Sequence, residues 1–146
     1  KTVKAIARKK GVRLVTIESS EMLMTYGFMA KVFDIFAKHN VPVDIVATSE
    51  VTISASIEEG DIKMLIQELN GLGDVRVDEN LNIISIVGTG LEGSLNLNAK
   101  ILQALADKQI DAKVITQGAT QSNFSLIVEE KNAENAQKAI HKVLFE

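Results

Sequence analysis

The sequence predicts an α+β protein built from two βαββαβ modules, each an antiparallel sheet with its helices on one face. Three observations support this class. The order strand, helix, strand, strand, helix, strand occurs before residue 80 and starts again after it. Residues 37–45 align with residues 106–114 across a helix-to-strand junction, and Val41 over Ile110 keeps the buried positions in phase. Apolar residues also switch between helical spacing and period two, as helices and half-buried strands require.

The first module begins with a β-branched run that is followed by a loop at residues 18–20. A helix is expected after Gly27, where apolar residues recur at helical spacing, and it ends at Asn40. Alternating apolar and polar residues then predict a hairpin with one wet face, and glycines stop the second helix. The expected strands are residues 12–17, 41–48, 51–57 and 75–78, and the expected helices are residues 25–38 and 62–69.

The second module repeats this pattern but ends without a closing strand. Its expected strands are residues 83–87, 112–116 and 123–128, its helices lie around residues 101–105 and 133–144, and a turn covers residues 88–90. A spare β-branched segment at residues 3–7 is therefore predicted to complete it. The domains are then residues 12–80 for module 1, inserted in module 2, which comprises residues 1–11 plus 81–146. Hydrogen exchange should show residues 3–7 protected.

The composition excludes several classes of function. The 146 residues are 46% hydrophobic and 24% charged with a net charge of −3, which argues against a nucleic-acid partner. The basic residues among 1–13 are interpreted as a solvated strand end. Cysteine is absent, and two histidines near predicted helix ends leave little for a metal site. No apolar run reaches the length of a membrane span, so we expect a cytoplasmic protein. Because the chain begins with Lys1 rather than Met, we expect a fragment or a processed chain.

Catalytic constellations are scarce. No Ser-His-Asp arrangement is supported, and the glycines at Gly88, Gly90 and Gly93 are better interpreted as a tight turn than as a phosphate-binding loop. The two modules differ in charge, since Asp44 and Glu50 of the first correspond to Lys113 and a neutral stretch in the second. Paired carboxylates near a helix start suit a ligand with ammonium and carboxylate groups. The alternative, two ordinary solvated charges, remains open.

Residues 20–56 resemble the C-terminal regulatory region of aspartate kinases, in particular the monofunctional, lysine-sensitive type. The second copy looks similar as well, so the resemblance covers essentially the whole chain. The matching segments are Met22-Leu23, Gly27-Phe28-Met29-Ala30, His39-Asn40, Val43-Asp44, Thr48-Ser49-Glu50-Val51, Ser85-Ile86-Val87-Gly88, Gln117-Gly118-Ala119 and Leu144-Phe145-Glu146.

This resemblance implies tandem ACT modules of ferredoxin-like fold that bind a free amino acid, which by the family's pattern is lysine, and that pair as a homodimer. Asp44 and Glu50 would meet the ammonium groups, and the helix-start amides would meet the carboxylate. No catalytic residue or metal site is expected. ATP and Mg²⁺ would bind only to the kinase domain, which would precede Lys1. The implied effector site comprises Met22, Thr25, Gly27, Phe28, Met29, Val43, Asp44, Thr48, Ser49 and Glu50.

Two other functions stay open. The chain could be a stand-alone amino-acid sensor that regulates another enzyme or a transcription factor. It could also be a ferredoxin-like enzyme or nucleic-acid module, but RNA readers of related topology carry aromatic residues on the open sheet face. Aromatic residues make up only 4% of this chain and tryptophan is absent, which disfavours that function.

Overall fold

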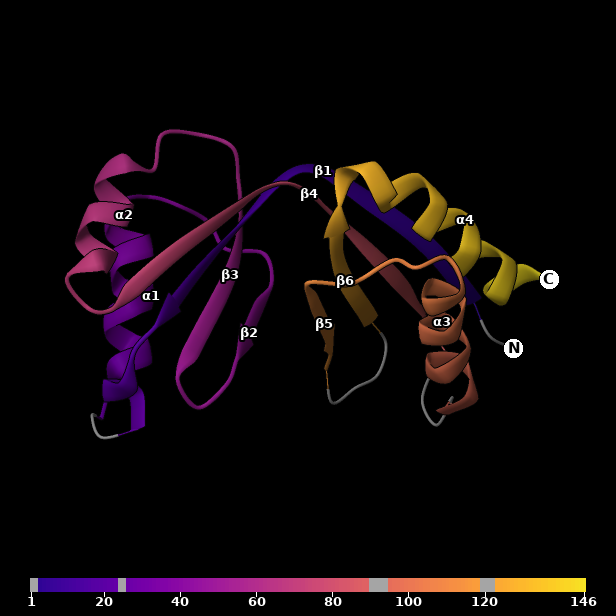
Figure 1. Cartoon of the computed structure of the whole chain (residues 1–146), viewed down its shortest axis with the longest axis horizontal. Coiled ribbons are helices and arrows are strands. Elements are labelled where there is room, and N and C mark those ends of the chain that lie inside the picture. The colour runs from indigo at the N-terminus through magenta and orange to yellow at the C-terminus, as the bar shows by residue number, and fades with distance from the viewer. Residues whose placement is uncertain (1–2, 24–25, 90–94, 119–122) are drawn as a thin grey trace. The chain divides into compact units, whose positions relative to one another are not determined.

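A computed structural model describes residues 3–23, 26–89, 95–118 and 123–146 (Figure 1). Contacts divide the chain into two compact units. We call residues Gly11–Glu79 the first module, and residues Lys1–Lys10 with Asn80–Glu146 the second. These bounds lie one residue from those expected from the sequence. The first module is therefore an insertion between the first strand segment of the second module and the remainder of it.

The first module has the strand order β2-β3-β1-β4. Strand β1 covers Val3–Glu18, and its part inside this module pairs antiparallel with β3 (Thr52–Glu58). Strand β2 (Val46–Thr48) pairs antiparallel with the other side of β3 and forms the edge. Helices α1 (Phe28–Lys38) and α2 (Lys63–Asn70) lie side by side (Figure 1), and a 3₁₀ helix, η1 (Ser20–Leu23), follows β1.

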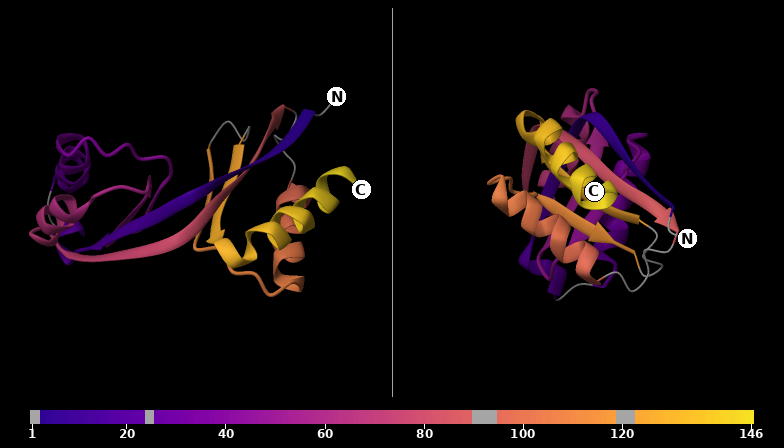
Figure 2. Two further views of the ribbon diagram at one scale, coloured as in Figure 1. Left: turned by 90° about the horizontal axis from the view of Figure 1, so that it is seen from above. Right: turned by 90° about the vertical axis from the view of Figure 1, so that its right-hand side faces the viewer.

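The second module has the equivalent order β1-β4-β6-β5. Strand β4 (Asp74–Thr89) pairs antiparallel with β6 (Asn123–Glu129), which pairs with the edge strand β5 (Val114–Gln117). Helices α3 (Leu95–Asp107) and α4 (Glu130–Phe145) pack on one face of this sheet (Figure 2). The N-terminal part of β1 supplies the fourth strand, in the place predicted for residues 3–7.

Two strands are longer than the sequence suggested. Residues 3–7 and 12–17 belong to the single strand β1, and residues 75–78 and 83–87 belong to β4. Each strand passes from one module to the other near a residue of left-handed backbone, Gly11 (φ 67°) in β1 and Asn80 (φ 58°) in β4. Glycine and asparagine tolerate this conformation, so they interrupt the hydrophobic pattern without ending the strand. The sequence pattern therefore predicted two separate strands where the structure has one.

The first helix of each module ends in the same way. Asn40 and Gln109 both have φ of 56°, one residue beyond the helix cap. The following backbone N–H then bonds back to the last turn, from Val41 to Phe36 O and from Ile110 to Leu105 O, at 2.9 Å in each module. This is the usual left-handed helix ending. Because it recurs in both modules, the two copies of the repeat align most clearly at this junction.

Each module has its own core between its helices and one sheet face. In the first, residues at helical spacing on α1, namely Phe28, Val32, Ile35 and Phe36, pack with alternate residues of β1 and β3. In the second, α3 and α4 cover alternate residues of β4 and β6 in the same manner. The predicted α+β class, with two repeats and helices on one sheet face, is confirmed.

Candidate functional site

The hairpin between β2 and β3 holds the residues that the sequence singled out. The Ser49 N–H donates to Thr52 O at 2.9 Å, and the hydroxyls of Ser49 and Thr52 lie 2.6 Å apart. The Thr52 N–H also donates to Ser49 Oγ at 3.2 Å. On the other side, the Ser19 N–H donates to Val51 O at 2.8 Å. These bonds fix the backbone of the turn and leave the Glu50 side chain exposed at its tip.

Strand β2 begins later than expected, at Val46 rather than at residue 41. Before it, Asp44 and Ile45 both face Ser56, because the Asp44 N–H donates to Ser56 O at 3.0 Å while the Ser56 N–H donates to Ile45 O at 2.8 Å. Two residues against one is the pattern of a β-bulge, which breaks the regular ladder. The buried Ser56 hydroxyl accepts the Ile45 N–H at 2.8 Å. This replaces the ladder bond that the bulge removes.

The bulge also determines which side chains face outward. Val43 packs against the core of the first module, whereas Asp44 is exposed. Thr48, Ser49 and Glu50 are exposed as well. Asp44 and Thr48 are four residues apart in extended chain, or roughly 13 Å. Asp44 and Glu50 therefore flank the two ends of β2, where they could contact different groups of one ligand but not the same group.

The start of α1 is the second part of the predicted site. Gly27 precedes the helix with φ of 77°, which favours glycine, and its carbonyl accepts the Lys31 N–H at 3.1 Å. Phe28 is buried in the core, while Met29 is 44% exposed. Met22 lies in η1. Thr25 lies outside the described residues, so the helix expected from residue 25 is described from Phe28 onward.

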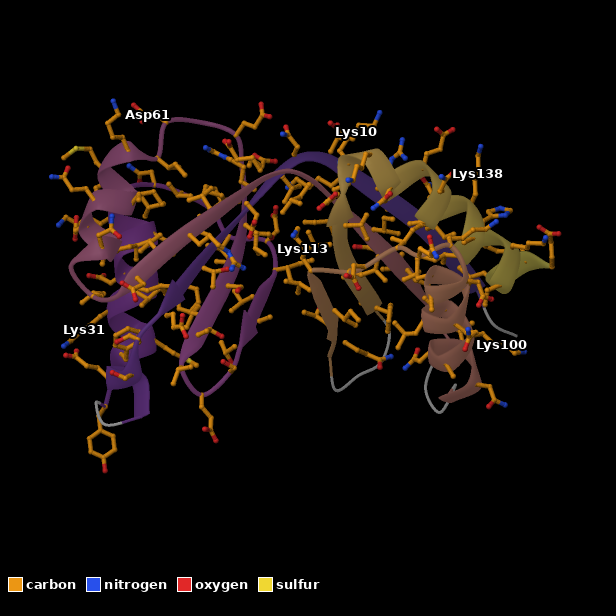
Figure 3. The ribbon with its side chains drawn as sticks, viewed as in Figure 1. Lys10, Lys31, Asp61, Lys100, Lys113 and Lys138 are labelled. Carbon is orange, nitrogen blue, oxygen red and sulfur yellow. The ribbon has the colours of Figure 1, made fainter. Side chains whose placement is uncertain are left out.

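The second module repeats this backbone with different side chains. Equivalent residues differ by 69 in number as far as β5 (Thr48 and Gln117) and by 71 from β6 onward (Ile53 and Phe124), so its hairpin is two residues longer. Its bulge carries Lys113 in place of Asp44, with the N–H donating to Ile127 O at 2.8 Å. Figure 3 labels Lys113 at the start of β5. The charge at this position is thus reversed between the modules.

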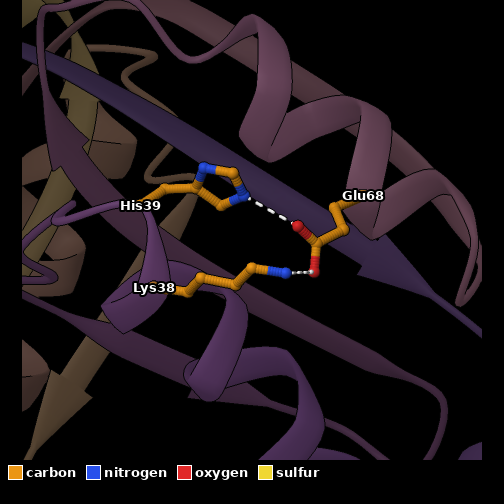
Figure 4. A network of polar contacts seen from close by, with 3 residues as sticks. All are labelled: Lys38, His39 and Glu68. Carbon is orange, nitrogen blue, oxygen red and sulfur yellow. Dashed lines mark hydrogen bonds and ion pairs between the residues drawn. The ribbon is translucent and has the colours of Figure 1, made fainter.

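A polar network that sequence reasoning missed joins α1 to α2. Glu68 Oε1 lies 2.8 Å from His39 Nε2, and its Oε2 accepts a bond from Lys38 Nζ at 3.2 Å (Figure 4). The hydrogen bond from His39, and then that from Lys38, holds the pKa of Glu68 below its usual value. The sequence does not predict this pairing, because His39 and Glu68 are 29 positions apart and their spacing indicates no contact.

Open surface in the described part of the second module includes a hollow of about 470 Å³ beside the end of α3, and one of its lining residues, Ala112, is the equivalent of Val43 in the predicted site. A groove of about 240 Å³ runs between α3 and α4, lined by Ala104, Asp107, Lys108, Ala139, Lys142 and Val143. Among the described residues no group of three or more His, Cys, Asp or Glu side chains could hold a metal ion. Within the same residues no helix is both long and apolar enough to cross a membrane.

Comparison with known proteins agrees with this architecture. The ACT domain model matches residues 15–70 and 84–144, one match in each module. Because these matches cover more than half of the chain, the protein belongs to the ACT domain family. The antiparallel four-stranded sheets and the paired helices described above are the fold of that family.

The chain is also similar to parts of aspartokinases. It is 34% identical to Aspartokinase 2, chloroplastic, of Arabidopsis thaliana over 97% of its length, but it spans only 28% of that relative. A putative C-terminal regulatory domain of aspartate kinase from Porphyromonas gingivalis W83 superposes with a TM-score of 0.84 at 35% identity, covering 99% of both chains. Escherichia coli aspartokinase III, in complex with lysine and aspartate, superposes with a TM-score of 0.83 at 30% identity. The match covers 97% of this chain and 33% of the E. coli chain.

Proposed function

We propose that this chain is the regulatory part of an aspartate kinase and that its first module binds free lysine. The supporting observation is the pair of exposed carboxylates, Asp44 and Glu50, at the two ends of β2. Lysine carries two ammonium groups at opposite ends of its side chain. Two separated carboxylates can each pair with one of them, whereas a single carboxylate could not pair with both. A structure of the similar E. coli aspartokinase III holds lysine and aspartate, and this is consistent with the proposal.

The proposed catalytic step belongs to a separate domain of the complete protein. That domain would transfer phosphate from ATP to L-aspartate to form 4-phospho-L-aspartate, with Mg²⁺ at the phosphates. This chain would supply feedback control of lysine, threonine and methionine biosynthesis. We propose that this chain itself binds no cofactor. A cytoplasmic location stays a prediction, since some of the relatives are chloroplastic.

Regulation requires that lysine prefer one arrangement of the protein, since a ligand shifts an equilibrium only by its differential affinity for two states. We propose that two copies pair through their first modules. The exposed apolar side chains Tyr26, Met29 and Val46 are consistent with such a surface, as is the unpaired edge of β2. Sedimentation of the chain with and without lysine measures this pairing directly.

Calorimetric titration tests the ligand. Lysine should release heat with the wild-type chain, while threonine, methionine and isoleucine should bind more weakly because they lack a second ammonium group. Absence of heat with all four amino acids would exclude the sensing function. If threonine binds more tightly than lysine, the role given to the paired carboxylates is excluded.

Substitution of Glu50 tests the site. Glu50→Ala should weaken lysine binding by about 1–3 kcal/mol, because a charge-assisted hydrogen bond to an ammonium group is lost. Glu59→Ala is the matched control, since it removes another exposed carboxylate, one that lies beyond the far end of β3. Equal affinity of the Glu50 variant and wild type would contradict the assigned role. In the complete kinase, Glu50→Ala should keep full activity and require correspondingly more lysine for inhibition.

A further inference from the structure

The second module contains a side-chain hydrogen bond at the position that corresponds to the proposed lysine site. Asn98 Nδ2 donates to Gln117 Oε1 at 2.9 Å. Asn98 lies near the start of α3 and Gln117 ends β5, so the bond joins a helix start to the end of an edge strand. Both residues are described, and both belong to the same module.

The repeat identifies their counterparts in the first module. With the offset of 69 residues that holds as far as β5, Asn98 corresponds to Met29 and Gln117 corresponds to Thr48. Met29 is 44% exposed and Thr48 is exposed, and both belong to the proposed site. A thioether donates no hydrogen bond, so this pair cannot form the same link. The first module therefore lacks the side-chain link that joins these two positions in the second module.

We propose that the Asn98–Gln117 hydrogen bond is a clasp that closes the second module to amino-acid ligands. This inference rests on the function proposed for the first module. A ligand placed between the start of α3 and the end of β5 must break the clasp before it can use these polar groups. Selectivity for one module thus depends on two differences, the charge reversal at Lys113 and the clasp itself.

The size of the effect follows from the strength of the bond. A hydrogen bond between neutral, exposed groups has a small net stability, because water competes for both partners. Breaking one weakens the apparent affinity of a competing ligand by about fivefold, the factor by which the open state is depopulated. The clasp is consequently a modest selectivity device that a single substitution removes.

The chemistry of the clasp also indicates which ligand an opened module would accept. Gln117→Ala removes one amide and leaves Asn98 as an unpaired donor. Free L-glutamine carries the missing amide on its own side chain and can restore the bond. The side chain of L-lysine cannot, because its ammonium group donates hydrogen bonds but accepts none, and the ammonium of Lys113 repels it.

The experiment is an NMR titration of the 146-residue chain with L-glutamine, following the backbone amides of α3 and β5. Gln117→Ala should bind L-glutamine about fivefold more tightly than wild type at these amides. The control variant Gln103→Ala loses a side-chain bond of 2.8 Å to Asp107 within α3, away from the clasp, and should bind like wild type. A purely structural loosening of α3 or β5 would not create affinity for glutamine over lysine.

Three results would overturn the proposal. If Gln117→Ala binds more weakly than wild type, the amides recognise a ligand instead of excluding one. If neither protein shows shifts at α3 and β5, there is no site to close. If lysine and glutamine bind the variant equally, amide restoration is not the cause. Lysine shifts at β2 and α1 are read in the same spectra, so failure of the lysine site is distinguished from failure of the clasp.

Discussion

The two modules share a backbone and differ where their surfaces carry polar side chains. In the first, Lys38, His39 and Glu68 fill the space between the ends of the two helices. In the second, the equivalent of Glu68 is Ala139, and the same region is the groove of about 240 Å³ between α3 and α4. Glu68 and Ala139 are each followed by a fully buried apolar residue, Leu69 and Ile140, so both helices contribute to their core at the next position.

This comparison shows which parts of the repeat are constrained. Helix endings, the bulge before each edge strand and the buried face of each sheet recur, because each is required by the fold. Charges around the edge strands and between the helices do not recur. The modules can therefore diverge in ligand binding without losing their shared architecture, and exchanging residues between equivalent positions tests this separation.

The largest expected effect comes from exchanging Ser56 and Ile127, which are equivalent and both fully buried. Ser56→Ile should destabilise the first module by roughly 2–5 kcal/mol, because the larger side chain overpacks its site and leaves the Ile45 N–H without its hydroxyl acceptor. Urea unfolding followed at amides of each module measures the change. The reciprocal Ile127→Ser should destabilise the second module by roughly 2–4 kcal/mol through the cavity it leaves. If the Ser56→Ile variant unfolds at the same urea concentration as the wild type, the Ser56 hydroxyl is dispensable for stability.

The next effect concerns the loop between α2 and β4 in the first module. A Cβ at Gly73 would lie 2.5 Å from Glu18 O and 3.0 Å from the Ser19 Cβ. Gly73→Ala should therefore cost about 1–3 kcal/mol, since backbone atoms must move to admit a methyl group. Gly118→Ala in the second module is the control, because its Cβ would meet nothing within 4 Å. Equal unfolding midpoints for the two variants would contradict the close approach.

The sequence predicted the repeat, the fold class and the order of elements, because helical and period-two spacings report burial locally. It predicted the inserted arrangement as well, since the second module lacked a strand and residues 3–7 were unassigned. It could not predict the bulge at Asp44 and Ile45, which depends on a register set by β3. Nor could it predict the Asn98–Gln117 or His39–Glu68 contacts, because each joins side chains that meet only after folding. The placement of Asp44 and Glu50 at opposite ends of β2 likewise required the observed strand.

The smallest expected effect is a pH dependence confined to the first module. The hydrogen bond from His39, followed by that from Lys38, lowers the pKa of Glu68 in the folded protein. A lowered pKa contributes stability that is present above the unfolded value and is lost as the pH falls through the folded value. The first module should therefore lose stability relative to the second as the pH falls below the usual glutamate pKa of about 4.3. Because 36% of the Glu68 side chain is accessible to solvent, screening keeps the loss small.

Substituting the residues of the second module into the first removes this difference. Glu68→Ala installs the equivalent residue, Ala139, and this variant should unfold in acid with the pH profile of the second module. Lys138→Ala is the control, because its pair with Glu134 lies within α4 and joins no second helix. Module-resolved urea midpoints at several pH values give the profiles. A Glu68→Ala profile that is unchanged from wild type would mean that the contact joining α1 to α2 contributes nothing to the acid stability of the first module.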